Sequence, residues 1–206
     1  MHLSLQIFLA SIAGYLLGSI SFATLICKRR GIDIFKEGSC NPGATNVKRI
    51  LGKKAGNTVF VLDFLKGFIA SLLPLLIAPP ESREVLAIVA IIAAIAGHSF
   101  SIFLRFRGGK GVATTMGGFL ALVPIVLIIG VLVWMVVYYS SRYVSLASIL
   151  FGVSLPIASF LLNESNWIVG FCGLIAGLLI VRHKSNIQRL INGTENRFSK
   201  KPDKAS

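Results

Sequence analysis

Long apolar runs separated by short polar segments extend through most of the chain. An apolar run of about 20 residues is long enough to cross a bilayer as a helix. Such runs predict helices over residues 3–27, 57–78, 85–104, 145–162 and 167–181. Their number and length indicate a helical protein that lies within a membrane.

The apolar run over residues 112–139 is too long for one comfortable span and short for two. The positions of the positive charges decide between these alternatives, because cytoplasmic loops are enriched in Lys and Arg. If the run turns near Pro124, with helices over about 112–122 and 125–140, the cytoplasmic side holds all 21 Lys and Arg residues except Lys66 and Arg83. We therefore expect an all-α integral membrane protein with seven transmembrane helices, an N-terminus outside and a cytoplasmic C-terminus.

We expect residues 1–197 to form a single transmembrane domain and residues 198–206 to form a disordered basic tail. The first helix has no basic leading region and no small-residue cleavage site, so we expect it to be retained in the mature protein. Gly14 and Gly18 lie four residues apart on this helix, a spacing that permits close packing against another helix.

Composition excludes a soluble globular protein. Hydrophobic residues make up 54% of the chain and charged residues 14%, whereas soluble proteins carry about 25% charged residues. The formal net charge of +13 is explained by membrane topology and anionic ligands, because the basic residues flank apolar runs; we expect no nucleic-acid partner. Cys27, Cys40 and Cys172 have no framework spacing, so we expect neither a disulfide nor a metal site.

A glycine-rich polar loop over residues 38–46 lies between two basic clusters. Short side chains let the backbone approach a ligand, and successive N–H groups can converge on an anion. Ser39, Thr45 and Asn46 add side-chain donors. A turn followed by a helix N-cap explains the same residues, so this loop alone does not decide between an anion site and a structural turn.

A second polar loop places Arg107 and Lys110 on either side of Gly108 and Gly109. Glycines expose backbone N–H groups to a phosphate, and lysine adds a point charge. A basic cytoplasmic loop that only sets the topology has the same composition.

A third polar run contains His183 and Asn186, which share one face of a helical turn. A histidine at a membrane boundary can act as an acid, as a base or as a hydrogen-bond donor to phosphate. The alternative is an interfacial helix whose basic side chains extend toward the headgroups.

Two further polar positions lie inside predicted spans. Asp63 and Lys66 are one helical turn apart, and we expect a structural ion pair between them. His98 lies in the last third of an apolar helix, where it either faces the site or hydrogen-bonds a neighbouring helix.

Four segments in one order resemble the bacterial acyl-phosphate-dependent glycerol-3-phosphate acyltransferases. They are GSCNPGATNVKR (38–49), RFRGGKGVAT (105–114), RYVSLAS (142–148) and RHKSNIQRLINGTE (182–195). The resemblance implies a seven-helix membrane enzyme that moves a fatty acyl group from acyl-phosphate to glycerol 3-phosphate. The products are 1-acyl-glycerol 3-phosphate (lysophosphatidic acid) and phosphate, in the first step of phospholipid synthesis and without cofactor or metal. The family usually has glycine where this chain has Cys40.

The resemblance also implies roles for individual residues. The catalytic group is Ser39, Lys110, His183 and Asn186. The substrate-binding residues are Gly38, Asn41, Gly43, Thr45, Asn46, Arg49, His98, Arg107, Gly108, Gly109, and Ser145 or Ser148. Asn41 and the backbone of residues 38–43 orient the acyl carbonyl. The proton of the attacking 1-hydroxyl passes to His183 or to a substrate phosphate oxygen, and the sequence leaves both open.

We expect a multi-pass protein of the bacterial inner membrane whose active-site loops face the cytoplasm. The His-x4-Asp pair of acyltransferases that use soluble donors is absent from the sequence, so acyl-CoA and acyl-carrier protein are not the expected donors. One alternative is a membrane transporter for a phosphorylated solute, and another is a protein that binds anionic lipid. The sequence indicates neither the acyl-chain preference nor the oligomeric state.

Overall fold

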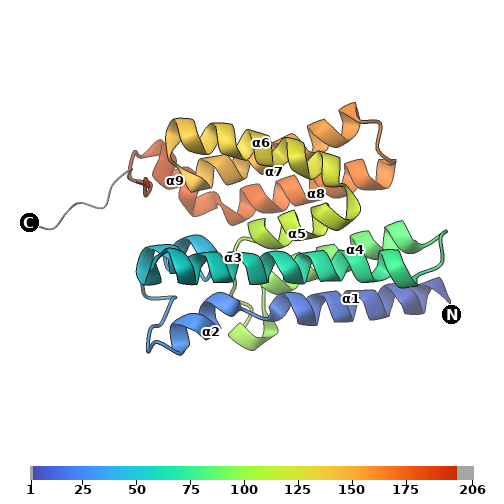
Figure 1. Cartoon of the computed structure of the whole chain (residues 1–206), viewed down its shortest axis with the longest axis horizontal. Helices are drawn as coiled ribbons and strands as arrows, with labels where there is room; N and C mark the ends of the chain where they lie inside the picture. Colours follow the sequence, from blue (N-terminus) through green and yellow to red (C-terminus); the bar gives the residue numbers. More distant parts are fainter. Residues whose placement is uncertain (1, 199–206) are drawn as a thin grey trace, which may run out of the picture. The chain divides into compact units, whose positions relative to one another are not determined.

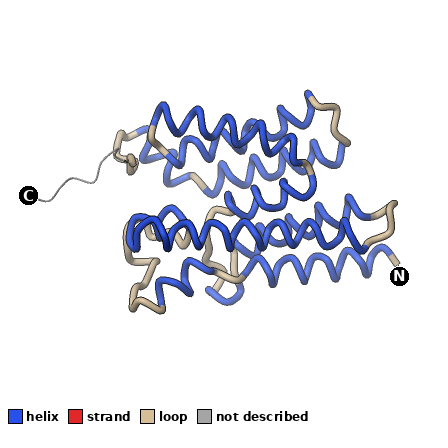
Figure 2. Tube along the Cα trace, in the orientation of Figure 1, coloured by secondary structure: helices blue, strands red, loops and turns tan. Residues whose placement is uncertain are grey.

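The computed structural model describes residues 2–198, and the regular elements within this range are all helical (Figures 1 and 2). This confirms the all-α prediction. The chain forms two compact units, one up to Pro124 and one from Ile125 onward. Of the expected tail over 198–206, all but Phe198 lies outside the described residues.

The first unit contains five α-helices and one short 3₁₀ helix within the described residues. They are α1 (Leu3–Ser19), α2 (Phe22–Lys28), α3 (Ala44–Ile77), α4 (Arg83–Ser99), η1 (Ile102–Leu104) and α5 (Val112–Leu122). Helix α1 packs along α4, and α3 packs along α4 and α5. A Cβ atom at Gly14 or Gly18 of α1 would collide with the backbone of Ala90 or Ala94 in α4, which confirms the close packing predicted for these glycines.

The expected first helix is broken at Ile20 and Ser21, which corrects the prediction of one continuous helix. Ile20 has extended backbone angles (φ −67°, ψ 113°), and Ser21 caps α2 by accepting a hydrogen bond from Thr24 N at 3.3 Å. The break leaves the carbonyl oxygens of Gly18 and Ile20 available, and both accept hydrogen bonds from Lys66 Nζ, at 2.9 and 2.8 Å. A cation from α3 therefore stabilises the break.

Helix α3 includes part of the expected polar segment. It begins at Ala44, directly after Gly43, and bends at Gly52, whose φ of 85° and ψ of 177° are not helical. The loop over residues 38–43 therefore leads straight into a helix N-terminus. Helix α4 in turn ends at Ser99, earlier than the sequence predicted.

The second unit contains α6 (Pro124–Ser141), α7 (Val144–Leu161), α8 (Asn166–Arg182) and α9 (Lys184–Ile191) within the described residues. Helices α7 and α8 pack against each other, and α9 follows α8 after a bend of 59°. Helix α5 ends at Leu122 and α6 starts at Pro124, so the predicted turn near Pro124 is confirmed. Proline at the first position of a helix is favoured because it has no N–H group to leave unpaired.

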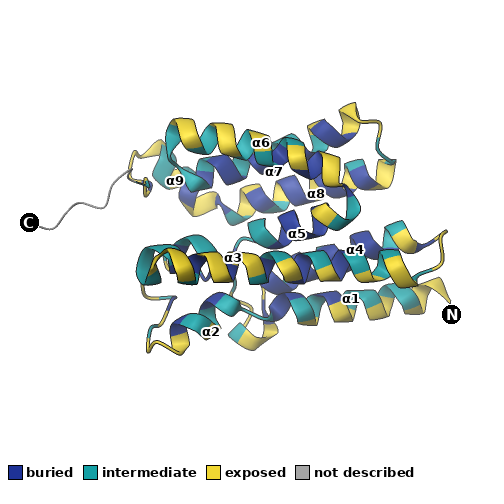
Figure 3. Ribbon diagram, viewed as in Figure 1, coloured by how far each residue is buried: buried dark blue, intermediate teal, exposed yellow. Residues whose placement is uncertain are grey.

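Large apolar side chains are exposed on both units (Figure 3). Ile77, Val136 and Phe160 have exposed fractions of 80%, 71% and 72%. Among the described residues, four segments are long and apolar enough to span a membrane, or five if the bent pair α8 and α9 counts as one. They are Leu3–Lys28, Ala44–Ile77, Pro124–Ser141 and Val144–Leu161. These exposed surfaces suit a lipid environment.

Candidate active site

The first polar loop is held in shape by one of its own residues. Asn46 is buried, and its Oδ1 atom accepts a hydrogen bond from Ser39 N at 2.8 Å. Its Nδ2 atom donates to Glu37 O at 2.9 Å. A Cβ atom at Gly38 would collide with the same Oδ1 atom. That Asn46 binds substrate stays a prediction, and the structure shows that its side-chain amide binds the backbone around the loop.

Two residues of this loop have left-handed backbone angles. The φ angle is 59° at Gly38 and 55° at Cys40. Glycine adopts such angles freely, whereas a Cβ atom costs roughly 1–2 kcal/mol. The resemblance predicted a glycine at the position of Cys40, and the backbone shows the physical reason for that preference. The Cys40 side chain is exposed.

The second polar loop lies against His98 and against the first loop. Gly109 N donates a hydrogen bond to His98 O at 3.0 Å. A Cβ atom at Gly109 would collide with the His98 ring and would lie 3.0 Å from Pro42 O, and one at Gly108 would collide with His98 O. These contacts leave room only for glycine. Within the first unit, the structure thus brings the two loops together.

The cations of the second loop lie close to the start of α5. Gly111, with a φ of 84°, is the residue before the helix, and the half-buried Lys110 precedes it. The guanidinium carbon of Arg107 lies 3.9 Å from the centre of the Phe35 ring. A helix N-terminus carries partial positive charge and N–H groups that attract anions. Lys110 and the start of α5 therefore form a candidate phosphate site.

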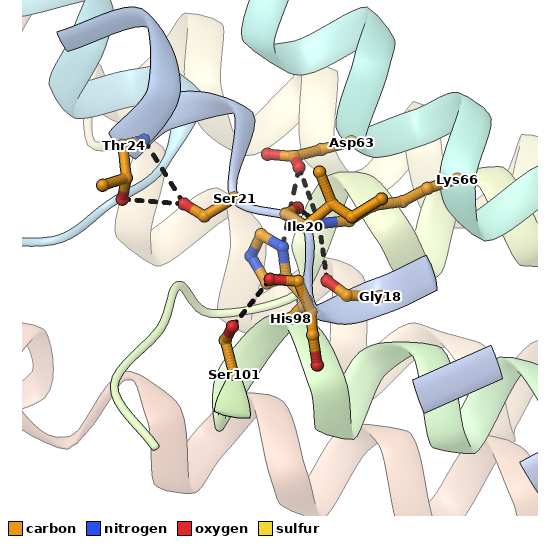
Figure 4. Close-up of polar contacts among 9 residues, drawn as sticks. Gly18, Ile20, Ser21, Thr24, Asp63, Lys66, His98 and Ser101 are labelled. Atoms are coloured by element: carbon orange, nitrogen blue, oxygen red, sulfur yellow. Dashed lines mark hydrogen bonds and ion pairs between the residues drawn. The ribbon is translucent and has the colours of Figure 1, made fainter. Parts of the chain in front are cut away.

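A buried network of charged groups lies behind His98 (Figure 4). Lys66 Nζ lies 2.9 Å from Asp63 Oδ1, and His98 Nδ1 lies 3.7 Å from the same oxygen. The predicted ion pair between Asp63 and Lys66 is confirmed. The His98 Nδ1 atom faces Asp63 of the neighbouring helix α3, and the ring lies against Gly109 of the second loop.

In the second unit, Glu195 joins three segments of the chain. Its carboxylate accepts hydrogen bonds from Ser145 Oγ at 2.9 Å, from Asn186 Nδ2 at 2.7 Å and from Arg189 Nε at 2.7 Å. Burial raises the pKa of Glu195, but these hydrogen bonds outweigh burial and hold the pKa below its usual value. The carboxylate is therefore ionised at neutral pH and fixes Ser145 relative to Asn186.

His183 lies at the bend between α8 and α9, and its side chain is buried. Its Nδ1 atom is 2.8 Å from Leu179 O. A carbonyl oxygen only accepts hydrogen bonds, so Nδ1 carries a proton and Nε2 is the proton-exchanging nitrogen of the neutral ring. Asn186 N donates to His183 O at 2.9 Å, which keeps both residues in one helical turn.

The two candidate serines have different partners. Ser145 donates to Glu195, which also binds Asn186. Ser148 instead donates to a backbone carbonyl of its own helix at 2.8 Å and lies 3.3 Å from Trp134 Nε1, which donates to it. Ser145 thus belongs to the cluster around Glu195, and Ser148 is bound to α6.

The remaining predicted residues of the first unit lie on or beside the first loop, and they are half-buried. They are Ser39, Asn41, Gly43, Thr45 and Arg49. The described contacts therefore gather the predicted residues into two clusters, one within each unit.

Comparison with known proteins decides the family. The model of a family described as glycerol-3-phosphate acyltransferase matches residues 8–193. The chain belongs to this acyltransferase family. The acyltransferase is 46% identical over 191 residues to a glycerol-3-phosphate acyltransferase of Desulforamulus reducens, with 92% of this chain and 94% of the relative covered. It is 44% identical over 187 residues to the Aquifex aeolicus protein of the same name, with 91% and 96% covered.

Solved structures show the same fold. The acyltransferase matches a crystal structure of PlsY, an integral membrane glycerol 3-phosphate acyltransferase, in its glycerol 3-phosphate form, at 40% identity and a TM-score of 0.88. The match covers 94% of this chain and 96% of that chain. The lysophosphatidic acid form matches with a TM-score of 0.85, covering 94% and 95%. These matches favour the enzyme over the transporter and the lipid-binding protein.

Glu195 was not among the predicted site residues of this acyltransferase. Its signal was present, because Glu195 is the only acidic residue in the sequence between 182 and 198, a segment otherwise rich in basic residues. A lone acid among bases is a candidate for a fixed ion pair. Spacing alone did not reveal that it also binds Ser145, which lies far away along the chain.

Proposed function

We propose that this membrane acyltransferase moves a fatty acyl group from acyl-phosphate to the 1-hydroxyl of glycerol 3-phosphate. The products are lysophosphatidic acid and inorganic phosphate. One observation carries the proposal: the PlsY relative of the same fold is known in a glycerol 3-phosphate form and in a lysophosphatidic acid form. These molecules are the acceptor and the acylated product of the proposed reaction.

The chemistry suits a site made of cations and backbone N–H groups. Acyl-phosphate is a mixed anhydride and is already activated, so no nucleophile from the protein is needed. The 1-hydroxyl oxygen bonds to the carbonyl carbon, the bond between that carbon and the phosphate oxygen breaks, and phosphate leaves with the electron pair. The hydroxyl proton passes to His183 Nε2 or to a phosphate oxygen. The protein positions two anions that otherwise repel each other.

The second loop is our candidate for one of the two phosphates. Lys110 supplies charge at the start of α5, and Gly108 and Gly109 keep the backbone close to the ligand. We assign Ser39 and Arg49 to phosphate binding beside this loop. Asn41, with the backbone of the first loop, orients the acyl carbonyl.

The cluster around Glu195 is our candidate for the other phosphate and for the reacting hydroxyl. Asn186 and His183 lie in one helical turn, and Glu195 fixes the Asn186 side chain. We choose Ser145 over Ser148 as the assisting serine, because Ser145 shares the Glu195 carboxylate with Asn186. We propose that both clusters serve the reaction and that residues 1–197 form a single domain.

We also propose seven spans, with the N-terminus outside and the polar loops on the cytoplasmic side of the bacterial inner membrane. Helical segments lie in each of the seven expected ranges, with the first range divided between α1 and α2. This topology leaves only Lys66 and Arg83 of the 21 Lys and Arg off the cytoplasmic side. A helix as short as α5 is tolerated at membrane depth when its neighbours bury it. In this topology the polar loops of both units lie on the same side of the membrane.

An assay of the purified protein tests the proposed donor. Glycerol 3-phosphate is supplied with either acyl-phosphate or acyl-CoA, and lysophosphatidic acid and free phosphate are measured. We expect product with acyl-phosphate only. Equal product from acyl-CoA, or none from acyl-phosphate, would overturn the proposal. Lys110→Ala and His183→Ala should each lower turnover more than tenfold, about 1.4 kcal/mol, while the protein still folds.

A further inference from the structure

We infer that Asp63 acts on the second polar loop from inside an apolar helix, by fixing the ring of His98 against Gly109. Asp63 and His98 are then positioning residues for the phosphate-binding loop. The inference rests on the proposed function, because it assumes that this loop binds a phosphate. It gives the buried ion pair of α3 a role beyond fold stability.

The network starts at the ammonium group of Lys66, which its contacts hold in one place. Lys66 Nζ donates to Gly18 O and Ile20 O, lies 2.9 Å from Asp63 Oδ1, and lies 5.8 Å from the centre of the Phe22 ring. The Lys66 side chain is almost fully buried. An ammonium group enclosed in this way holds its carboxylate partner in place, because separating two buried charges is costly.

The carboxylate in turn faces His98. Asp63 Oδ1 lies between Lys66 Nζ and His98 Nδ1, which is 3.7 Å away (Figure 4). A carboxylate beside a histidine fixes the orientation of the ring and favours a proton on the nitrogen that faces it. His98 is buried, so few other orientations are open to its ring.

The ring then limits where the loop can lie. His98 O accepts a hydrogen bond from Gly109 N at 3.0 Å, and the ring fills the space that a Cβ atom at Gly109 would need. Lys110 is the next residue along the chain. A rotation of the ring would therefore displace the backbone that carries Lys110, and the contacts from Lys66 to Gly109 form one continuous path.

A double-mutant cycle tests the path. Asp63→Asn keeps the shape and an acceptor oxygen but removes the charge, and His98→Phe keeps a ring but removes the Nδ1 atom that faces Asp63. Steady-state kinetics are measured for each variant while acyl-phosphate and glycerol 3-phosphate are varied in turn. We expect each single change to raise the KM of the substrate held by this loop at least threefold. The KM of the other substrate should change less than twofold.

The double variant gives the decisive comparison. If Asp63 acts through His98, adding Asp63→Asn to His98→Phe raises that KM no further. The inference would be overturned if the KM increases of the two single changes multiply in the double variant. It would also be overturned if kcat falls with both KM values unchanged, or if nothing changes. Turnover by the unaltered enzyme would still support the proposed function, so the two failures are distinguishable.

A second pair of variants keeps the test informative if His98→Phe does not fold. The amide of His98→Asn can donate toward Asp63, whereas His98→Ala offers no donor. We expect His98→Ala to raise the KM of the substrate held by this loop. The rise should be at least twofold smaller for His98→Asn. Equal KM values for these two variants would overturn the inference.

Discussion

Asn186 Nδ2 donates a hydrogen bond of 2.7 Å to Glu195 Oε1, and both residues are buried. The same oxygen accepts the Ser145 hydroxyl, and the second carboxylate oxygen accepts Arg189 Nε. The segment after α9 is thereby joined to the start of α7. An acidic residue that need not meet a substrate thus determines where a proposed catalytic amide lies.

Glu195→Gln should lower the stability of the folded protein by about 1–3 kcal/mol, because a carboxamide cannot accept hydrogen bonds from all three donors. Turnover should fall as well, since Asn186 loses its fixed partner. Unfolding of the detergent-solubilised protein measures the first effect. Glu81→Gln is the matched control, because Glu81 is exposed and should change stability by less than about 0.5 kcal/mol. Equal stability of the two variants would contradict the role of Glu195.

The lowered pKa of Glu195 predicts how stability depends on pH. Its folded-state pKa lies below the ordinary glutamate value of about 4.3. The unfolded chain therefore binds the proton more readily, so the stabilisation is complete above that value and is lost as the pH falls through the folded-state pKa. Between roughly pH 6 and pH 3, the unfolding temperature should fall further for the unaltered protein than for Glu195→Gln. Parallel curves would show that Glu195 does not carry this dependence.

Sequence patterns predicted features that local chemistry determines. The positive-charge distribution indicated a turn near Pro124, and the structure starts a helix there. The break at Ile20 was missed because Ser19 and Ser21, which flank it, lie within a longer apolar run, while the group that stabilises the break, Lys66, comes from another helix. Contacts between distant residues have no signature in a local window.

The same limit applies to the candidate site. Gly108 and Gly109 were predicted to expose backbone N–H groups to a phosphate, which stays a prediction, and the structure adds that both pack closely against His98. Asn46 was predicted to bind substrate because its side-chain amide can donate hydrogen bonds. A sequence does not show which acceptor such an amide meets. In the structure, the Asn46 side-chain amide hydrogen-bonds the backbone of Ser39 and Glu37.

Cys40→Gly should stabilise the protein by about 1 kcal/mol, because glycine adopts the φ of 55° at this position without strain. The more flexible unfolded chain offsets part of the gain. Cys40→Ala removes the thiol but keeps the Cβ atom, so it should give no stabilisation. Unfolding curves for the two variants make the comparison, and a stabilised Cys40→Ala would point to the thiol instead of the backbone.

Gly109→Ala should reduce turnover more than tenfold, because the added Cβ atom would meet the His98 ring and Pro42 O. The change lies in a loop, so the helices should still form. Gly173→Ala is the control, since no described atom lies within 4 Å of a Cβ atom built there. It should leave turnover unchanged and add up to about 1 kcal/mol of helix stability. Similar turnover in both variants would remove Gly109 from the site.

The proposed topology requires the first loop and the start of α9 to face the same side of the membrane. Both carry an exposed position for thiol labelling: Cys40 in the first loop, and Ser185 beside His183. Ser185→Cys in a Cys40→Ala background reports on α9, while Cys27 and Cys172 are buried.

The most direct measurement labels these two thiols with a membrane-impermeant reagent in inside-out and right-side-out vesicles. Both thiols should react in inside-out vesicles only, where the cytoplasmic face is exposed to the reagent. Reaction of Cys40 and of the cysteine at position 185 from opposite sides would contradict the proposed cytoplasmic placement of both clusters.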